Sequence, residues 1–122
     1  MKHLHRNFIF YLILTGMITL YFSRCTKDKI TPGCIQQKID GYRRQPVTNP
    51  PAEVWKYSYR GTTVYFFPNE SQVMVDGCSE LVDAECNYLC APTGCFSGNG
   101  DGRCPDFLNE RTNGILIWRD NR

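Results

Sequence analysis

The number and placement of its cysteines constrain this chain more than any other feature. The 122 residues contain seven cysteines, and one of them, Cys25, closely follows an apolar N-terminal run. Six cysteines in a short exported domain are typical of three disulfides that staple a small fold. The sequence does not choose among the possible pairings. The six disulfide candidates are Cys34, Cys78, Cys86, Cys90, Cys95 and Cys104.

The N-terminus has the organisation of an export signal. Lys2 and Arg6 precede an almost unbroken apolar run, FIFYLILTGMITLYF, over residues 8–22. The run has about the length of a signal-peptide core and is shorter than the roughly 20 residues of a membrane-spanning helix. We therefore interpret residues 1–24 as a signal peptide.

Cys25 is the candidate lipidation site. Ser23 and Cys25 at the end of the apolar run resemble a bacterial lipobox, in which the cysteine thiol receives a diacylglycerol before the preceding peptide bond is cut. Acyl chains such as palmitate then hold the protein on a membrane. Arg24 departs from the small residue of a lipobox, so an uncleaved apolar anchor or an ordinary signal cleavage stays open. Cysteine parity favours lipidation, because it uses the one cysteine that three bridges leave over.

The charges after Cys25 give no support to a nucleic-acid partner. Lys2, Arg6 and Arg24 account for three of the fourteen basic residues, whereas all twelve acidic residues follow Cys25. The exported part is therefore close to neutral. Nucleic-acid binding needs a basic surface, so we expect no nucleic-acid partner.

The exported domain begins with helical spacing. Thr31-Pro32 is typical of a helix start, with a hydroxyl cap before a proline. Ile35, Ile39 and Tyr42 follow on one helical face, and Pro46 stops the helix. We expect a short amphipathic helix that packs on the rest of the domain.

Strand patterns follow the helix. Residues 54–60 alternate aromatic and polar side chains, residues 62–68 are dense in aromatic and β-branched ones, and Arg60-Gly61 lies between them, which predicts a hairpin. Leu81-Val82 and Tyr88-Leu89 flank a tight turn and predict a second hairpin.

The remaining segments complete an α+β prediction. Residues 91–106 are rich in Gly, Pro and Cys, which predicts an irregular loop held by disulfides. Residues 105–111 predict one or two helical turns that end at Gly114. A strand is expected at 115–120. Val73 and Val75 leave a further short strand open. We expect a tether over 25–31 and a small disulfide-rich domain over 32–122, with one short N-terminal helix on an antiparallel sheet of about two hairpins plus a C-terminal strand.

Histidine is absent from the exported part, because His3 and His5 both precede the apolar run. This excludes a Ser-His-Asp or Cys-His arrangement there, as well as a histidine-containing zinc site. A four-cysteine zinc site at Cys86-x3-Cys90-x4-Cys95-x8-Cys104 lacks the tight C-x2-C spacing, and export favours bridges. We expect no enzyme and no cofactor.

Two groups of oxygen-bearing side chains are candidate sites. Asn99 and Asp101, in the segment Ser97 to Gly102, imitate half of a calcium loop. Ser97 and Leu108 stand where that loop needs carboxylates, so a glycine-permitted turn is favoured over a calcium site. Four carboxylates lie close together in sequence around the second hairpin: Asp76, Glu80, Asp83 and Glu85. A pair of them could serve a hydrolase, but a solvated hairpin surface explains them more simply.

The aromatic residues of the first hairpin admit a core or a binding role. As core they supply the apolar area that a small domain needs, and as surface they would form a stacking platform. Alternation favours the core for most of them. The residues are Trp55, Tyr57, Tyr59, Tyr65, Phe66 and Phe67.

Several segments together resemble a family of small exported lipoproteins from Bacteroidota that carry a domain of unknown function. They are NPPAEVW, GTTVYFFP, DGCSELVDAECNYLCAPTG with its C-N-x-x-C-x-P motif, SGNGDGRCPDF with its G-x-G-D-G-x-C-P-D-F motif, and ILIWRDNR. In this family a second cysteine is frequent where Gly77 stands, and Asp-Gly-Gly is frequent at 93–95. The resemblance implies a location and an architecture, with one bridge rearranged here, and it transfers no catalytic residue.

The sequence therefore predicts a non-catalytic binding or scaffolding module. We expect it on the bacterial cell envelope, at the outer membrane or a periplasmic face, attached to the membrane by the lipid on Cys25. An envelope protein or a glycan is the expected partner. The alternative is a protease-inhibitor-like secreted domain that presents the segment from Cys90 to Cys104.

Overall fold

The structure, a computed structural model, describes residues 31–69, 77–95 and 98–122. The signal peptide expected at residues 1–24, the expected lipidation site Cys25 and the possible strand at Val73 and Val75 lie outside these residues. Of the helices in the described ranges, none is long and apolar enough to cross a membrane.

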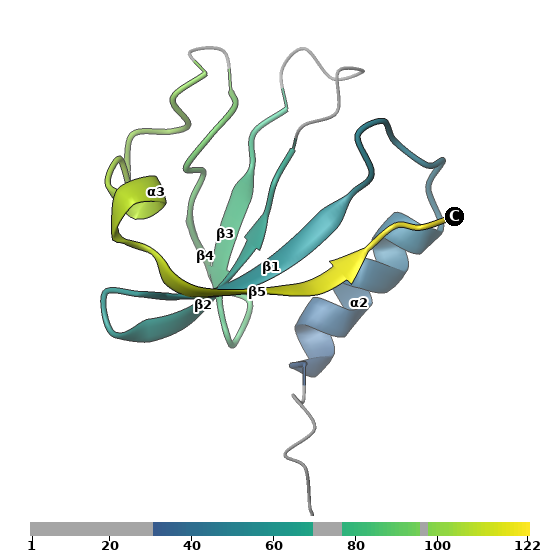
Figure 1. The fold of residues 1–122 in the computed structure, drawn as a ribbon, viewed down its shortest axis with the longest axis horizontal. Coiled ribbons are helices and arrows are strands. Elements are labelled where there is room, and N and C mark those ends of the chain that lie inside the picture. The colour runs from purple at the N-terminus through teal and green to yellow at the C-terminus, as the bar shows by residue number, and fades with distance from the viewer. Residues whose placement is uncertain (1–30, 70–76, 96–97) are drawn as a thin grey trace, which may run out of the picture. The chain divides into compact units, whose positions relative to one another are not determined.

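An antiparallel five-stranded sheet forms the centre of the domain (Figure 1). Its order β4-β3-β2-β1-β5 places the two hairpins side by side and returns the last strand to the first. The expected α+β, disulfide-rich fold is confirmed. The elements are α2 (Gly33–Arg43), β1 (Glu53–Tyr59), β2 (Thr62–Phe67), β3 (Glu80–Asp83), β4 (Tyr88–Cys90), α3 (Phe107–Glu110) and β5 (Thr112–Arg119).

The predicted first hairpin, β1 with β2, is confirmed at the centre of the sheet. Its register runs from the pair Trp55 and Phe66 to the pair Tyr59 and Thr62. The connecting residues Arg60-Gly61 have φ values of 49° and 77°. A left-handed conformation at both central residues is typical of the type I′ turn, whose twist matches that of the two strands.

The alternation of β1 and β2 divides the aromatic side chains between two cores. On one face, Tyr59 and Phe66 are buried around Phe107 of α3. On the other face, Phe67 is buried beneath Ile35 and Ile39 of α2, with Tyr65 beside them. The sheet is therefore covered on both sides, by α2 on one and by α3 with its preceding loop on the other.

Two predictions about helix ends were wrong. The N-cap residue of α2 is Pro32, and no side chain caps its first turn, so Thr31 is not the cap. Gly114 does not end α3, because it lies within β5. A Cβ atom at Gly114 would stand 2.6 Å from Cε1 of Tyr57. Glycine is required there so that the ring can lie over the neighbouring strand.

The three expected disulfides are present, and each ties a covering segment or loop to the sheet region. One joins α2 to the turn between β3 and β4, with a sequence separation of 52 residues. The second joins β4 to the segment before α3, and the third joins the segment before β3 to the irregular loop. The pairs are Cys34–Cys86, Cys90–Cys104 and Cys78–Cys95.

We predict that Cys78–Cys95 is reduced first and Cys90–Cys104 last. Cys78 is exposed, whereas Cys90 and Cys104 are 2% and 5% exposed, and attack on a disulfide requires access to sulfur. Stepwise reduction of the folded protein, followed by alkylation and peptide mass mapping, should label Cys78 and Cys95 while the other bridges are intact. The half-buried Cys34–Cys86 bridge is the internal reference. Alkylation of Cys90 or Cys104 at the first step would contradict the prediction.

Candidate functional site

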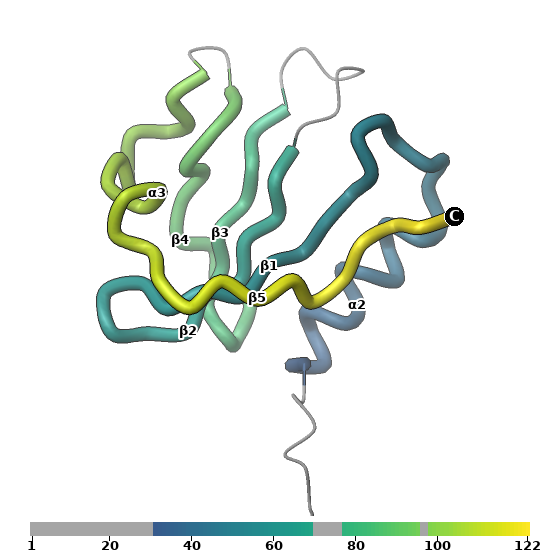
Figure 2. Tube along the Cα trace, in the orientation of Figure 1, coloured from purple at the N-terminus to yellow at the C-terminus, as the bar shows by residue number. Residues whose placement is uncertain are grey.

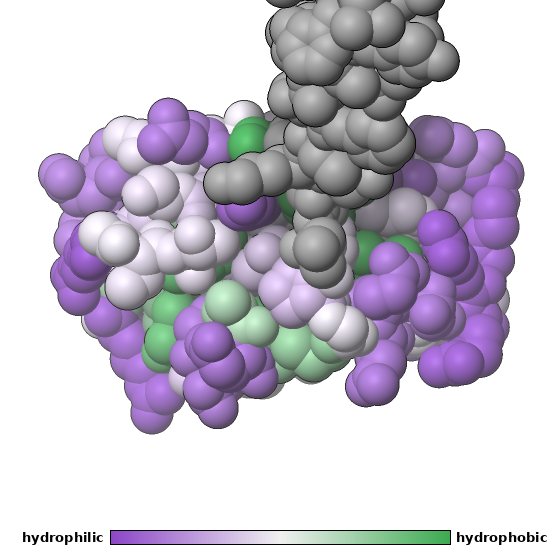
Figure 3. Space-filling view, turned by 90° about the horizontal axis from the view of Figure 1, so that it is seen from below, coloured by the Kyte–Doolittle hydropathy of each residue, from purple (hydrophilic) through white to green (hydrophobic). Residues whose placement is uncertain are grey.

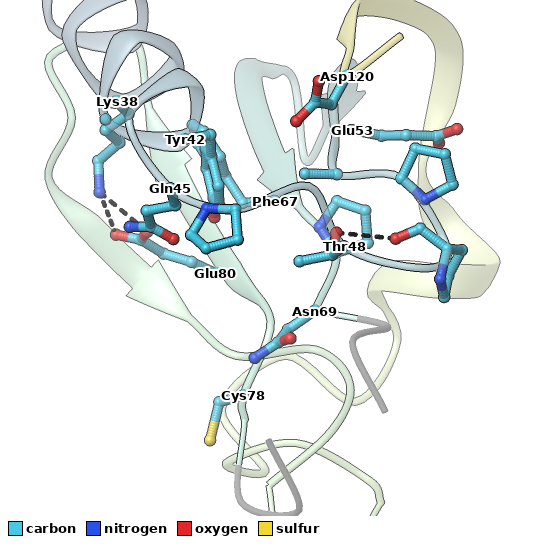
Figure 4. A pocket seen from close by; sticks show the side chains of 16 residues that line it. Lys38, Tyr42, Gln45, Thr48, Glu53, Phe67, Asn69, Cys78, Glu80 and Asp120 are labelled. Carbon is cyan, nitrogen blue, oxygen red and sulfur yellow. Dashed lines mark hydrogen bonds and ion pairs between the residues drawn. The ribbon is translucent and has the colours of Figure 1, made fainter. Parts of the chain in front are cut away.

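A hollow lies between the C-terminal half of α2 and one end of the sheet (Figure 4). Its volume is about 450 Å³, which lies in the range typical of small-ligand sites. The first residue of β1, the last of β2, the first of β3 and the residue after β5 all reach it. The lining residues are Lys38, Gly41, Tyr42, Gln45, Pro46, Thr48, Pro50, Pro51, Ala52, Glu53, Phe67, Pro68, Asn69, Cys78, Glu80 and Asp120.

The wall opposite the sheet end is built by the proline-containing segment 45–52. Proline has no backbone N–H, so Pro46, Pro50 and Pro51 can neither extend α2 nor donate to a strand. The segment leaves α2 after Arg43 and reaches β1 without regular structure. It therefore encloses a space instead of closing onto the sheet.

Tyr42 presents its hydroxyl group to the hollow. Its ring stacks on Phe67 and on Trp118, with centroid distances of 6.2 Å in both cases. Figure 4 shows the hydroxyl directed toward the middle of the hollow. Burial, and then the charge of Glu80, raise the pKa of Tyr42, so the hydroxyl is neutral at physiological pH.

Ion pairs neutralise the charged groups that α2, β1 and β3 bring to the hollow. The ammonium of Lys38 donates to both oxygens of Glu80, at 2.7 and 2.9 Å, and lies 5.4 Å from the centroid of the Phe67 ring. Glu53 accepts hydrogen bonds from the indole N–H of Trp55 and from Nε of Arg119, both at 2.6 Å.

Asp120 and Arg122 fasten the C-terminal segment to the end of α2. The guanidinium donates to Oδ1 and Oδ2 of Asp120 at 2.9 and 2.8 Å. It also donates to the backbone carbonyls of Tyr42, Arg43 and Gln45, where a helix end needs donors. Figure 2 shows the chain end beside the end of α2. The hydrogen bonds from Arg122 lower the pKa of Asp120.

Neutral amides and a hydroxyl complete the rim. The hydroxyl of Thr48 donates to the carbonyl of Pro50 at 2.8 Å. The carboxamide of Asn69 lies against Gly77, where a Cβ atom would stand 1.9 Å from Nδ2 of Asn69. A larger residue at 77 would displace this amide, so glycine at 77 leaves room for Asn69.

The structure places the calcium-loop candidate in a hydrogen-bonded turn. Asp101 accepts from the hydroxyl of Tyr88 at 2.7 Å and from the backbone N–H of Arg103 at 3.0 Å, and the Tyr88 bond is the main cause of its lowered pKa. Asn99 forms an isolated bridge with Gly94. In the described residues, no group of three acidic, histidine or cysteine side chains could hold a metal ion.

The other acidic and cysteine candidates also have structural partners. Asp83 accepts from the backbone N–H groups of Glu85 and Asn87, at 3.0 and 2.8 Å, and so shapes the turn of the second hairpin. Glu80 is paired with Lys38, and Asp76 lies outside the described residues. The four cysteines considered for zinc are all in bridges.

Among the described residues, the exposed large apolar side chains come from separate parts of the fold. Trp55 and Tyr57 are half-buried, with ring centroids 6.1 Å apart. Seen from below, hydrophilic side chains border a smaller apolar area (Figure 3). The exposed large apolar residues are spread over a loop and three elements: Val47, Tyr88, Leu89, Leu108 and Leu116.

Sequence reasoning missed the hollow. It placed Tyr42 only on the packed face of a helix and residue 120 only at the end of a strand, and it gave no role to Asn69. The one local signal was the group of prolines between a helix and a strand, which marks a segment that cannot pair.

We predict that Asp120→Asn lowers the stability of the fold at neutral pH. The stability of the variant should also change less with pH in the acid range. A depressed folded-state pKa stabilises the fold above the ordinary value of 3.8, and this contribution is lost as the pH falls through the depressed value. Thermal unfolding midpoints of wild type and variant should therefore converge as the pH falls below about 4. Asp40→Asn, which removes a partly exposed carboxylate that pairs with Arg43 within α2, is the control. A difference that stays constant with pH would contradict the prediction.

Comparison with known proteins gives one match. The sequence model of a family described as a domain of unknown function, DUF6970, matches residues 40–120, which is more than half of the chain. No curated protein and no solved structure matches. The chain therefore belongs to the DUF6970 family.

Proposed function

We propose that this chain is a non-catalytic binding module of the bacterial cell envelope, held by a lipid on Cys25 at the outer membrane or a periplasmic face. The observation that carries the proposal is the pairing of the cysteines. Six of the seven form three bridges among themselves, which leaves Cys25 as the remaining thiol. Disulfides persist in oxidising compartments, and a cysteine after an apolar signal is suited to acylation.

The tether would keep the domain close to the membrane. Residues 25–31 are seven residues long and span at most about 25 Å when extended. The resemblance to exported Bacteroidota lipoproteins supports the same location. A partner at this position would be an envelope protein or a glycan.

The chemistry of the domain supports binding more than catalysis. The hollow is a preformed concave site, and its cysteine, Cys78, is in a bridge. Each carboxylate that lines it accepts hydrogen bonds from a cationic side chain. Neutral groups around a preformed space can hold a ligand, whereas nucleophilic catalysis needs an activated nucleophile.

The protease-inhibitor alternative has less support. An inhibitory loop presents an extended, exposed segment to its target. Here Ala91 and Pro92, at the start of the segment between Cys90 and Cys104, are buried, and its exposed residues 101–103 lie in a turn and bend instead of an extended segment. The N–H of Asp101 donates to the carbonyl of Ala91 at 2.9 Å, which folds the segment back on itself.

We predict that mass spectrometry of the membrane fraction finds a mature N-terminus that begins at an acylated Cys25. The Cys25→Ala variant should lose the acyl mass and retain its signal peptide or leave the membrane fraction. A mature N-terminus at another residue, in a chain without acyl mass, would falsify the proposed anchoring.

A second variant tests whether Arg24 limits cleavage of the chain before Cys25. Arg24 stands where a lipobox has a small residue, so Arg24→Gly should raise the fraction of chain that is processed at Cys25. Lys27→Gly, in the tether, is the control and should leave that fraction unchanged. Equal processing of Arg24→Gly and wild type would show that Arg24 does not limit the reaction.

A further inference from the structure

The charges that line the hollow leave no free ion to attract a charged ligand. Of the described residues around it, four are charged: Lys38, Glu53, Glu80 and Asp120. Lys38 and Glu80 are paired with each other, and Glu53 and Asp120 are paired with arginines. A charged ligand would have to displace one of these partners and leave a half-buried group unpaired, which is costly.

The groups that face the space without a charge are bifunctional. Tyr42 uses its ring for packing and presents its hydroxyl to the hollow, while Gln45 and Asn69 contribute carboxamides to the rim. Hydroxyls and carboxamides both donate and accept hydrogen bonds. A ligand whose groups also both donate and accept can form hydrogen bonds with them in several orientations.

The proline walls disfavour a peptide main chain as the ligand. Recognition of an extended peptide relies on backbone N–H and C=O groups that pair with it. Pro46, Pro50, Pro51 and Pro68 line the hollow, and none of them has an N–H to donate. Their rings instead offer apolar surface beside the polar rim, which suits a molecule with C–H groups on its faces and hydroxyls at its edge.

We infer that the hollow binds a neutral, hydroxyl-rich ligand of the saccharide class, in preference to ionic ligands and to peptides. The inference rests on the proposed function, because it takes the hollow to be the ligand site of an envelope module. Recognition is by neutral hydrogen bonds and apolar contact, so affinity depends little on salt.

Trp118 reports on the hollow through its contact with Tyr42. Its ring stacks on Tyr42, which lines the space, whereas Trp55 is on the opposite face of the sheet. The chain contains two tryptophans, so Trp55→Phe leaves Trp118 as the sole indole, and Glu53 loses the indole donor but keeps its bond from Arg119. The full chain in detergent, carrying Trp55→Phe, is titrated with neutral oligosaccharides of glucose, mannose and N-acetylglucosamine. Uronic-acid oligosaccharides, glucosamine oligomers and proline-rich peptides are titrated in parallel.

We predict that at least one neutral oligosaccharide changes Trp118 fluorescence saturably, with equal affinity at low and high salt. Tyr42→Phe removes only the hydroxyl and should weaken this binding about 10-fold, the loss expected for one hydrogen bond at a partly buried site. Tyr57→Phe makes the same change on the other face of the sheet and is the matched control. Asn69→Ala provides a second test at the rim. Unchanged unfolding midpoints would show that each variant folds.

Three results would overturn the inference. Tighter binding of an acidic, basic or peptide ligand in the hollow would refute the neutral class while leaving the proposed function intact. An unchanged affinity in both folded Tyr42→Phe and Asn69→Ala would place the saccharide elsewhere. If no ligand of any class affects Trp118, the hollow fails as the ligand site, and the acylation of Cys25 is judged separately by mass.

Discussion

Each face of the sheet is covered by a helix that is too short to be stable by itself. The rest of the structure depends on the bonds that hold these two helices to the sheet. α2 has 11 residues and α3 has four, whereas isolated helices shorter than about 12–15 residues are marginal in water. Cys34 fixes the start of α2 to the turn after β3, and Cys104 fixes the segment before α3 to β4. In the chain-entropy account, a bridge that closes a loop of 52 residues contributes about 4 kcal/mol. That is comparable with the whole stability of a small core.

The second face shows how one short helix can serve as a cover. Phe107 is completely buried and meets the rings of Tyr57 and Tyr59 edge-on, at centroid distances of 5.8 and 5.3 Å. The guanidinium of Arg111 lies 4.7 Å from the Tyr57 ring centroid, and Asp106 accepts from the hydroxyl of Tyr59 at 2.7 Å. Contacts before, within and after α3 thus hold it to the hairpin. The aromatic residues on this face are used mainly as core.

Sequence could predict the parts of the fold whose signals are local. The alternation in β1 and the Arg60-Gly61 turn were sufficient for the first hairpin, and the spacing of Ile35 and Ile39 was sufficient for α2. The bridge pairing, the place of β5 beside β1 and the role of Gly114 depend on residues distant in sequence, so they could not be derived from local patterns. The hollow could not be predicted for the same reason, because its polar groups come from several separate segments that only the fold brings together.

The hollow itself follows from the way α2 is fixed at both ends. Cys34 holds its first turn, and Arg122 holds the carbonyls at its last turn. Neither end of α2 can therefore move toward the sheet, and the prolines that follow α2 cannot pair with a strand. A space is left between α2, this proline-containing segment and the end of the sheet. The restraints that keep this space open are a disulfide and hydrogen bonds from a guanidinium to backbone carbonyls, and they form within the protein itself. Binding there would therefore cost little ordering of the protein, which is the physical advantage of a preformed site.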